Sequence, residues 1–92
     1  MTLKEIEKRA YTLEGKTIDP LDKETVNKNI LKILDNCINK NINLNINEND
    51  FVEIINIYYS IYNKYDKDFF KNISSLSINE INFFKVINKL NN

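Results

Sequence analysis

The chain has one glycine, Gly15, and one proline, Pro20, among its 92 residues. Tight turns depend on these two residue types, and all-β sandwiches need a turn roughly every 8–12 residues. A chain with so few turn formers is better suited to helices joined by polar loops. This scarcity therefore predicts an all-α fold, and the length is that of one domain, residues 1–92.

Two amphipathic helices are expected in the first half of the chain. One is predicted over residues 3–14, where Thr2 and Glu5 have the spacing of a capping box, and it would end at the glycine. The other is predicted over residues 22–40 with Asp22 as its N-cap, and it has the clearest apolar face in the chain.

The third predicted helix spans residues 49–65, with Asn49 as its cap. Apolar side chains cover most of its circumference, which is typical of the central helix of a bundle. The sequence Asp-Lys-Asp at 66–68 should end it, and residues 68–73 add a short helical turn.

The last helix is predicted over residues 78–90, with Ser77 and Glu80 again at capping-box spacing. The predicted fold is therefore an all-α, small four-helix bundle with a short extra helical turn, packed around the third helix.

Residues 41–47 alternate strictly between asparagine and an apolar residue, which places Ile42, Leu44 and Ile46 on one side. A period of two indicates extended backbone with one half-buried face. We expect an extended Asn/Ile linker that lays these three side chains onto the bundle. An edge strand that pairs with another chain is the open alternative.

Charge and hydropathy exclude several classes of partner. Thirteen basic and thirteen acidic side chains give no net charge, whereas nucleic-acid binders usually carry a basic excess. No apolar run reaches the roughly 18–20 residues that span a bilayer, and the charged N-terminus lacks the features of a signal peptide. The lone Cys37 forms no internal disulfide, so we expect a cytoplasmic protein.

The side chains for bond-making chemistry are scarce. There is no histidine, the commonest general base and metal ligand. Cys37 lies within the apolar face of its helix and is expected to be a buried thiol. The close acidic pairs are better explained as helix caps, and a single glycine cannot build a phosphate-binding loop. We therefore predict a protein that is not an enzyme, with no catalytic residues, no cofactor and no metal.

Tyrosine is favoured at protein interfaces because it is amphipathic and stiff. Tyr58, Tyr62 and Tyr65 follow helical spacing and are assigned to the core. Tyr59 and Val52 lie on the flank of the third helix, and Tyr11 lies off the apolar stripe of the first. Tyr11, Val52 and Tyr59 are the predicted partner-binding residues. A homodimer that completes the third helix with a second copy is also open.

A helix-turn-helix interpretation applies to residues 69–90. A short helix and a serine-rich turn precede a terminal helix whose polar residues could read adenine and touch phosphate. These residues are Asn79, Asn82, Lys85, Asn88 and Lys89. The lack of basic surplus favours a solvated polar face instead.

In size, helicity and neutrality, the chain resembles two groups of small proteins. One is the inhibitors encoded by phages and plasmids, anti-CRISPR proteins among them, and the other is the bacteriocin immunity proteins, which are compact four-helix bundles. The abundance of Asn, Ile and Lys, whose codons are A/T-rich, indicates a low-G+C genome. We expect a small inhibitor or accessory protein that covers a surface on a larger host protein. A DNA-binding regulator and an immunity-type bundle are the alternatives.

Overall fold

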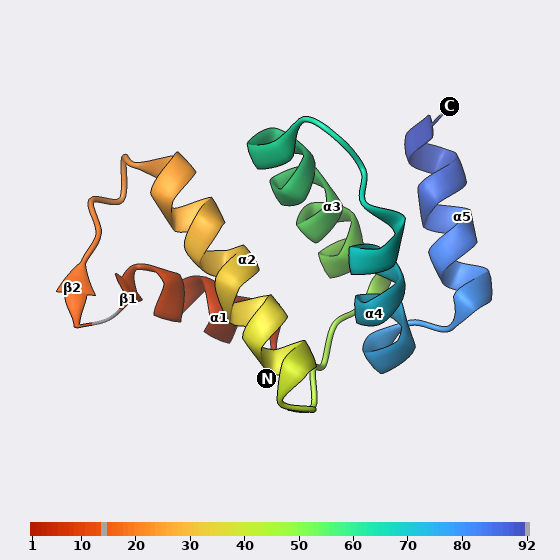
Figure 1. Ribbon diagram of the computed structural model, residues 1–92, viewed down its shortest axis with the longest axis horizontal. Coiled ribbons are helices and arrows are strands. Elements are labelled where there is room, and N and C mark those ends of the chain that lie inside the picture. The colour runs from red at the N-terminus through yellow and green to blue at the C-terminus, as the bar shows by residue number, and fades with distance from the viewer. Residues whose placement is uncertain (14, 92) are drawn as a thin grey trace.

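The computed structural model describes residues 1–13 and 15–91, without the side chains of Ser77 and Asn91. Within these residues the fold is all-α, as predicted, with five helices and one small antiparallel hairpin (Figure 1). The elements in chain order are α1 (Leu3–Ala10), β1 (Thr12–Leu13), β2 (Lys16–Thr17), α2 (Lys23–Asn39), α3 (Glu48–Tyr62), α4 (Lys67–Ser77) and α5 (Glu80–Asn91).

The helices are arranged along the longest axis of an elongated molecule that measures 38 × 27 × 19 Å. In Figure 1, α1 crosses α2 at one end, α3 follows α2, and α4 and α5 form the other end. α3 contacts both α2 and α5, and α4 also reaches α2. The N-terminal and C-terminal helix pairs are thus joined through α3 and through the contact between α2 and α4.

The core is centred on α3, as its apolar circumference predicted. Phe51, Ile54 and Ile55 are completely buried. The Phe51 ring makes an edge contact with Phe70 of α4, with ring centroids 6.2 Å apart, and lies 5.9 Å from Phe83 of α5. One aromatic side chain therefore contacts two of the surrounding helices.

The first helix is shorter than predicted, because it ends at Ala10 rather than at residue 14, which lies outside the described residues. The buried side-chain amide of Asn29 on α2 donates a hydrogen bond to the Ala10 carbonyl at 3.0 Å. The chain then pairs β1 with β2 around Gly15, whose φ of +74° is a left-handed conformation that glycine adopts without strain. Gly15 is therefore part of a hairpin turn and does not end a helix.

The linker begins with Asn41, which has a left-handed φ of 54°, so the predicted extended segment does not start at residue 41. Residues 42–47 form a non-helical linker that buries Leu44 and Ile46, as predicted, but Ile42 is exposed. It pairs with the N-terminus of its own chain through a single parallel bridge between Thr2 and Asn45. The Asn45 amide donates to the Met1 carbonyl at 2.9 Å. Ile42 comes too early to join this pairing, because its amide still donates to the last turn of α2.

The cap of α3 is Asn47, not the predicted Asn49. The Asn47 side chain accepts a hydrogen bond from the Asp50 amide at 2.8 Å, and the Asp50 carboxylate accepts one from the Asn47 amide at 3.3 Å. Both asparagines are suitable caps, but only Asn47 has an acid three residues later. The helix ends at Tyr62 because Asn63 adopts a left-handed φ of 51°.

The predicted short turn at 68–73 is part of a complete helix, α4. Asp66 caps it by accepting hydrogen bonds from the amides of Asp68 at 3.0 Å and Phe69 at 3.2 Å. The described residues therefore form five helices where the sequence predicted four and a turn. The segment was too short to show its helical period clearly after the Asp-Lys-Asp stop signal.

The last helix begins at Glu80, two residues later than predicted, and Asn79 precedes it as the cap. The Asn79 side chain accepts a hydrogen bond from the Asn82 amide at 3.0 Å. Ile78 is extended and buried between α4 and α5, so it separates the two helices instead of opening the second. Ser77 is the last residue of α4, and the predicted capping role of its side chain lies outside the described residues.

We predict that Asn29→Ala lowers the free energy of unfolding by about 1–3 kcal/mol, because the Ala10 carbonyl loses its buried donor. Urea denaturation measures the change. The control is Asn36→Ala on the exposed side of the same helix, which should stay within about 0.5 kcal/mol of the parent. Equal unfolding midpoints for the two variants would show that the hydrogen bond does not fix the end of α1.

Candidate functional site

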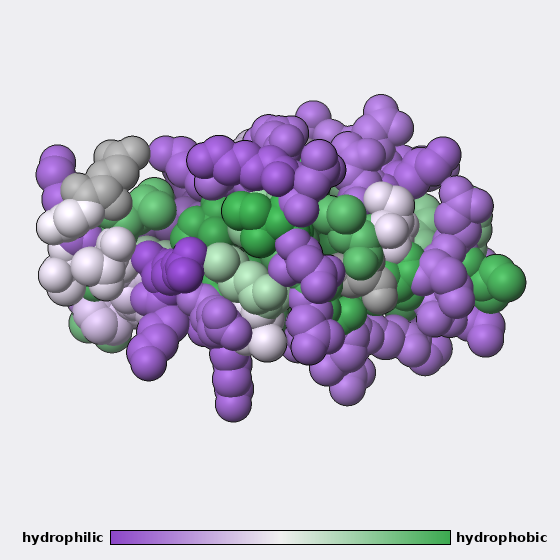
Figure 2. Space-filling view, turned by 90° about the horizontal axis from the view of Figure 1, so that it is seen from below, coloured by the Kyte–Doolittle hydropathy of each residue, from purple (hydrophilic) through white to green (hydrophobic). Residues whose placement is uncertain are grey.

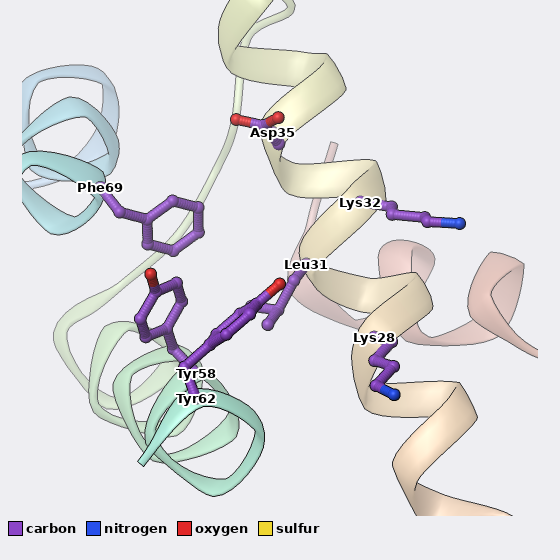
Figure 3. Close-up of a pocket in the computed structure, with 7 residues that line it drawn as sticks. All are labelled: Lys28, Leu31, Lys32, Asp35, Tyr58, Tyr62 and Phe69. Carbon is purple, nitrogen blue, oxygen red and sulfur yellow. The ribbon is translucent and has the colours of Figure 1, made fainter. Parts of the chain in front are cut away.

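A groove of about 320 Å³ opens between α2 and the aromatic side chains of α3 and α4. Figure 3 shows Tyr58, Tyr62 and Phe69 on one side and the α2 residues on the other. The lining consists of Lys28, Leu31, Lys32, Asp35, Tyr58, Tyr62 and Phe69. Leu31 is buried, while the charged residues of α2 are exposed. The groove is thus an apolar and aromatic surface with charges of both signs along one edge.

The aromatic wall of the groove is organised by Tyr58. Its ring stacks on Phe69, with centroids 4.8 Å apart, and lies 4.7 Å from the ring of Tyr62, one turn later on α3. Its hydroxyl donates to the Asp66 carboxylate at 3.3 Å. Burial, and secondly the negative charge of Asp66, raise the pKa of Tyr58. The phenol therefore stays protonated and links α3 to the residue that caps α4.

Three further tyrosines are exposed at the C-terminal end of α3, and we call Tyr59, Tyr62 and Tyr65 the tyrosine patch. Their exposed fractions are 41%, 52% and 38%. Tyr65 stacks on Tyr59 with ring centroids 4.7 Å apart and an interplanar angle of 27°. This contact forms because the left-handed residue Asn63 turns the chain back after α3 ends. The patch adjoins the groove through Tyr62, which belongs to both.

The assignment of three tyrosines to the core was right only for Tyr58, which is 8% exposed. Tyr62 and Tyr65 are largely at the surface, although their helical spacing placed them with the core. The helix ends before Tyr65, and in its last turn Ile61 packs against the core while Tyr59 and Tyr62 are exposed. Helical periodicity does not show where a helix ends. The Asn63-Lys64 pair is a local feature that could have indicated the end of α3.

The three predicted partner-binding residues do not form one surface. Tyr59 is exposed, whereas Val52 and Tyr11 are half-buried. Val52 and Tyr59 share a face of α3, since they are seven residues apart. Tyr11 instead lines a separate cavity that includes Ile57, which lies about 140–160° around α3 from those two residues at 100° per residue.

That separate cavity, of about 280 Å³, contains a pair of acids on neighbouring helices. Burial raises the pKa of Glu7 on α1, and a hydrogen bond with Glu53 of α3 and the charge of Glu53 raise it further. Close by, the Lys23 ammonium donates to the Tyr11 hydroxyl at 3.4 Å and lies 5.9 Å from the centroid of its ring. Tyr11 is therefore engaged with its own chain.

Metal-binding side chains do not gather in the described part of the chain. Among these residues, no three acidic, cysteine or histidine side chains gather where they could hold a metal ion. Cys37 is buried, as expected for a structural thiol. None of the helices described combines the length and the apolar character needed to cross a bilayer.

Comparison of the chain with protein-family models, curated proteins and solved structures gives no match. The groove and the adjoining tyrosine patch are the surface on which a functional proposal can rest.

We predict that Glu53→Gln stabilises the protein at about pH 7 by up to about 0.5 kcal/mol, because it removes a carboxylate that faces Glu7. The raised pKa of Glu7 means that the folded state binds a proton more tightly than the unfolded state. Its contribution to stability is therefore full below the ordinary value of 4.5 and is lost as pH rises through the raised pKa.

Urea denaturation at about pH 4 and about pH 7 would measure this effect. The variant should gain stability mainly at the higher pH. Asp35→Asn, which removes an exposed carboxylate from α2, is the control and should show no such gain. A Glu53→Gln variant that is less stable than the parent at both pH values would contradict the proposed repulsion.

Proposed function

We propose that this protein is a non-enzymatic binding module that covers a surface on a larger protein, with the tyrosine patch and the adjoining groove as its contact surface. The observation that carries this proposal is the clustering of three exposed tyrosines at one end of α3. Tyrosine is among the residues that contribute most binding energy at protein interfaces, where its ring packs and its hydroxyl forms hydrogen bonds.

The patch is held in place before any partner arrives. Tyr59 and Tyr65 are stacked on each other, and Tyr62 lies against the buried ring of Tyr58. Side chains that are already ordered lose less entropy on binding, so more of the contact energy contributes to affinity. Exposed aromatic residues scattered singly would need no explanation, but Tyr59 and Tyr62 lie one turn apart on α3, and Tyr65, beyond the end of the helix, stacks on Tyr59.

The charges around the groove favour a protein partner over a polyanion. Lys28 and Lys32 lie on the α2 edge together with Asp35, and Lys28 is already paired with Glu24 at 3.2 Å. A surface with both signs of charge around an apolar centre matches the polar rim and apolar core of protein interfaces. A protein surface that binds nucleic acid requires an excess of positive charge instead.

The surface of α5 gives little support to the alternative of a DNA-binding regulator. As a recognition helix, α5 would present Ile81 and Phe84 to the major groove, since these are 70% and 58% exposed. Base edges are read mainly by polar side chains, so this face is poorly suited to the task. If the protein is instead an immunity-type bundle, the same tyrosine patch would be its contact surface. A host protein as target, a cytoplasmic location and an origin in a mobile element remain parts of our proposal.

We predict that the double variant Tyr59→Ala/Tyr62→Ala loses most of its partner binding. Immobilised protein would be incubated with lysate from a low-G+C bacterium, and the captured protein would be identified and its affinity measured. Losing two anchors should weaken binding roughly 10-fold to 100-fold, since each truncation costs about 1 kcal/mol or more.

The matched control is Leu21→Ala, because Leu21 is an apolar residue that is 86% exposed in the loop before α2. It should capture the same partner with unchanged affinity. Circular dichroism would establish that both variants keep the helical content of the parent. If the tyrosine variant captured the partner as well as the control did, the patch would not be the contact surface, and the absence of any captured protein would argue against a binding module.

A further inference from the structure

The last helix, α5, has two apolar faces, and the chain covers only one of them. Phe83 and Val86 are buried against α3 and α4. Ile81 and Phe84 point to the other side and are 70% and 58% exposed. In Figure 2, hydrophobic side chains reach the surface at the right-hand end of the molecule, where α5 lies. This exposed face is separate from the tyrosine patch.

The exposed face has the residue pattern of a short coiled-coil seam. Ile81, Phe84 and Asn88 follow the spacing of successive a, d and a positions, and they fall within about 60° of arc at 100° per residue. Glu80 and Lys85 flank the seam on opposite sides, at the g and e positions. Both flanking residues are exposed, and neither forms an ion pair with another described residue.

We propose that this face binds a second copy of the chain, with the two α5 helices side by side and parallel around a two-fold axis. In parallel coiled coils, a residue at g faces the e residue five positions later in the other helix. Glu80 of each copy would then face Lys85 of the other, giving two ion pairs related by symmetry. Ile81 and Phe84 would pack against their counterparts at the centre.

The charge pattern favours a parallel pair of α5 helices over an antiparallel pair. An antiparallel pair would bring like flanks together, so that Lys85 of one copy would lie on the same side as Lys85 of the other. Only the parallel arrangement pairs each acid with a base. The asparagine at an a position, Asn88, is also a common device for fixing the register of two parallel helices. The rest of each chain lies behind Phe83 and Val86, on the side away from the seam.

The interface is short, so the dimer should be weak. The seam covers fewer than two heptads. The area that it buries is therefore well below the roughly 800 Å² per partner of a standard interface. We expect a dissociation constant between about 10 and 500 µM. Added salt should weaken the dimer, because the two ion pairs lie at the rim.

Sedimentation velocity of the full chain, over protein concentrations from about 10 µM to about 1 mM, would test the proposal. The parent should show a concentration-dependent shift from monomer to dimer. Glu80→Lys and Lys85→Glu should each weaken the dimer roughly 10-fold, because two attractive pairs become repulsive. The double variant Glu80→Lys/Lys85→Glu should recover the parent's dissociation constant, since the pairs are restored with their signs exchanged.

Leu21→Ala is the matched control and should dimerise like the parent. All five substituted or parent proteins should have the same circular dichroism spectrum, because the altered side chains are exposed. A parent that remains monomeric at the highest concentration would overturn the proposal. A dimer that is insensitive to the single charge reversals, or one that the double variant fails to restore, would also overturn it. None of these results depends on whether the tyrosine patch binds a larger protein.

Discussion

The burial of Phe51 is the contact on which the rest of this structure depends. Its ring meets Phe70 of α4 and Phe83 of α5 within about 6 Å, and Ile54 and Ile55 extend the same buried face along α3. Small helical domains have little apolar surface to bury, so a single central helix that touches most of its neighbours is an efficient arrangement. The two surfaces on which our proposals rest lie where the neighbouring helices no longer cover the side chains of α3 or α5.

The first of these places is the C-terminal end of α3. The helix continues beyond the part that its neighbours cover, and Tyr62 and Tyr59 emerge there into solvent. The chain reversal at Asn63 then brings Tyr65 back onto Tyr59. The proposed contact surface therefore consists of residues at the end of α3 that the neighbouring helices leave uncovered. The second place is α5, which covers α3 and α4 with one face and leaves the other face open.

The sequence predicted the helical class and the central helix because those depend on period and composition, which are local properties. It also identified Asp22 and Thr2 as caps, since each accepts a hydrogen bond from an amide three residues later. It was wrong about Asn49 and about the end of the first helix. Two asparagines were suitable caps for α3, and the carbonyl at the end of α1 accepts a hydrogen bond from Asn29, which is 19 residues away in sequence.

For the candidate site, the sequence selected Tyr59 correctly as an exposed side chain but joined it to Tyr11 and Val52, which are half-buried. Helical periodicity determines which residues share a face, and that was enough to find the buried face of α3. It does not determine which faces the neighbouring helices cover. Which faces are covered depends on how the linker, the hairpin and the α4–α5 connection orient the helices that they join. Only the tertiary structure therefore decided that Tyr62, Tyr65, Ile81 and Phe84 remain at the surface.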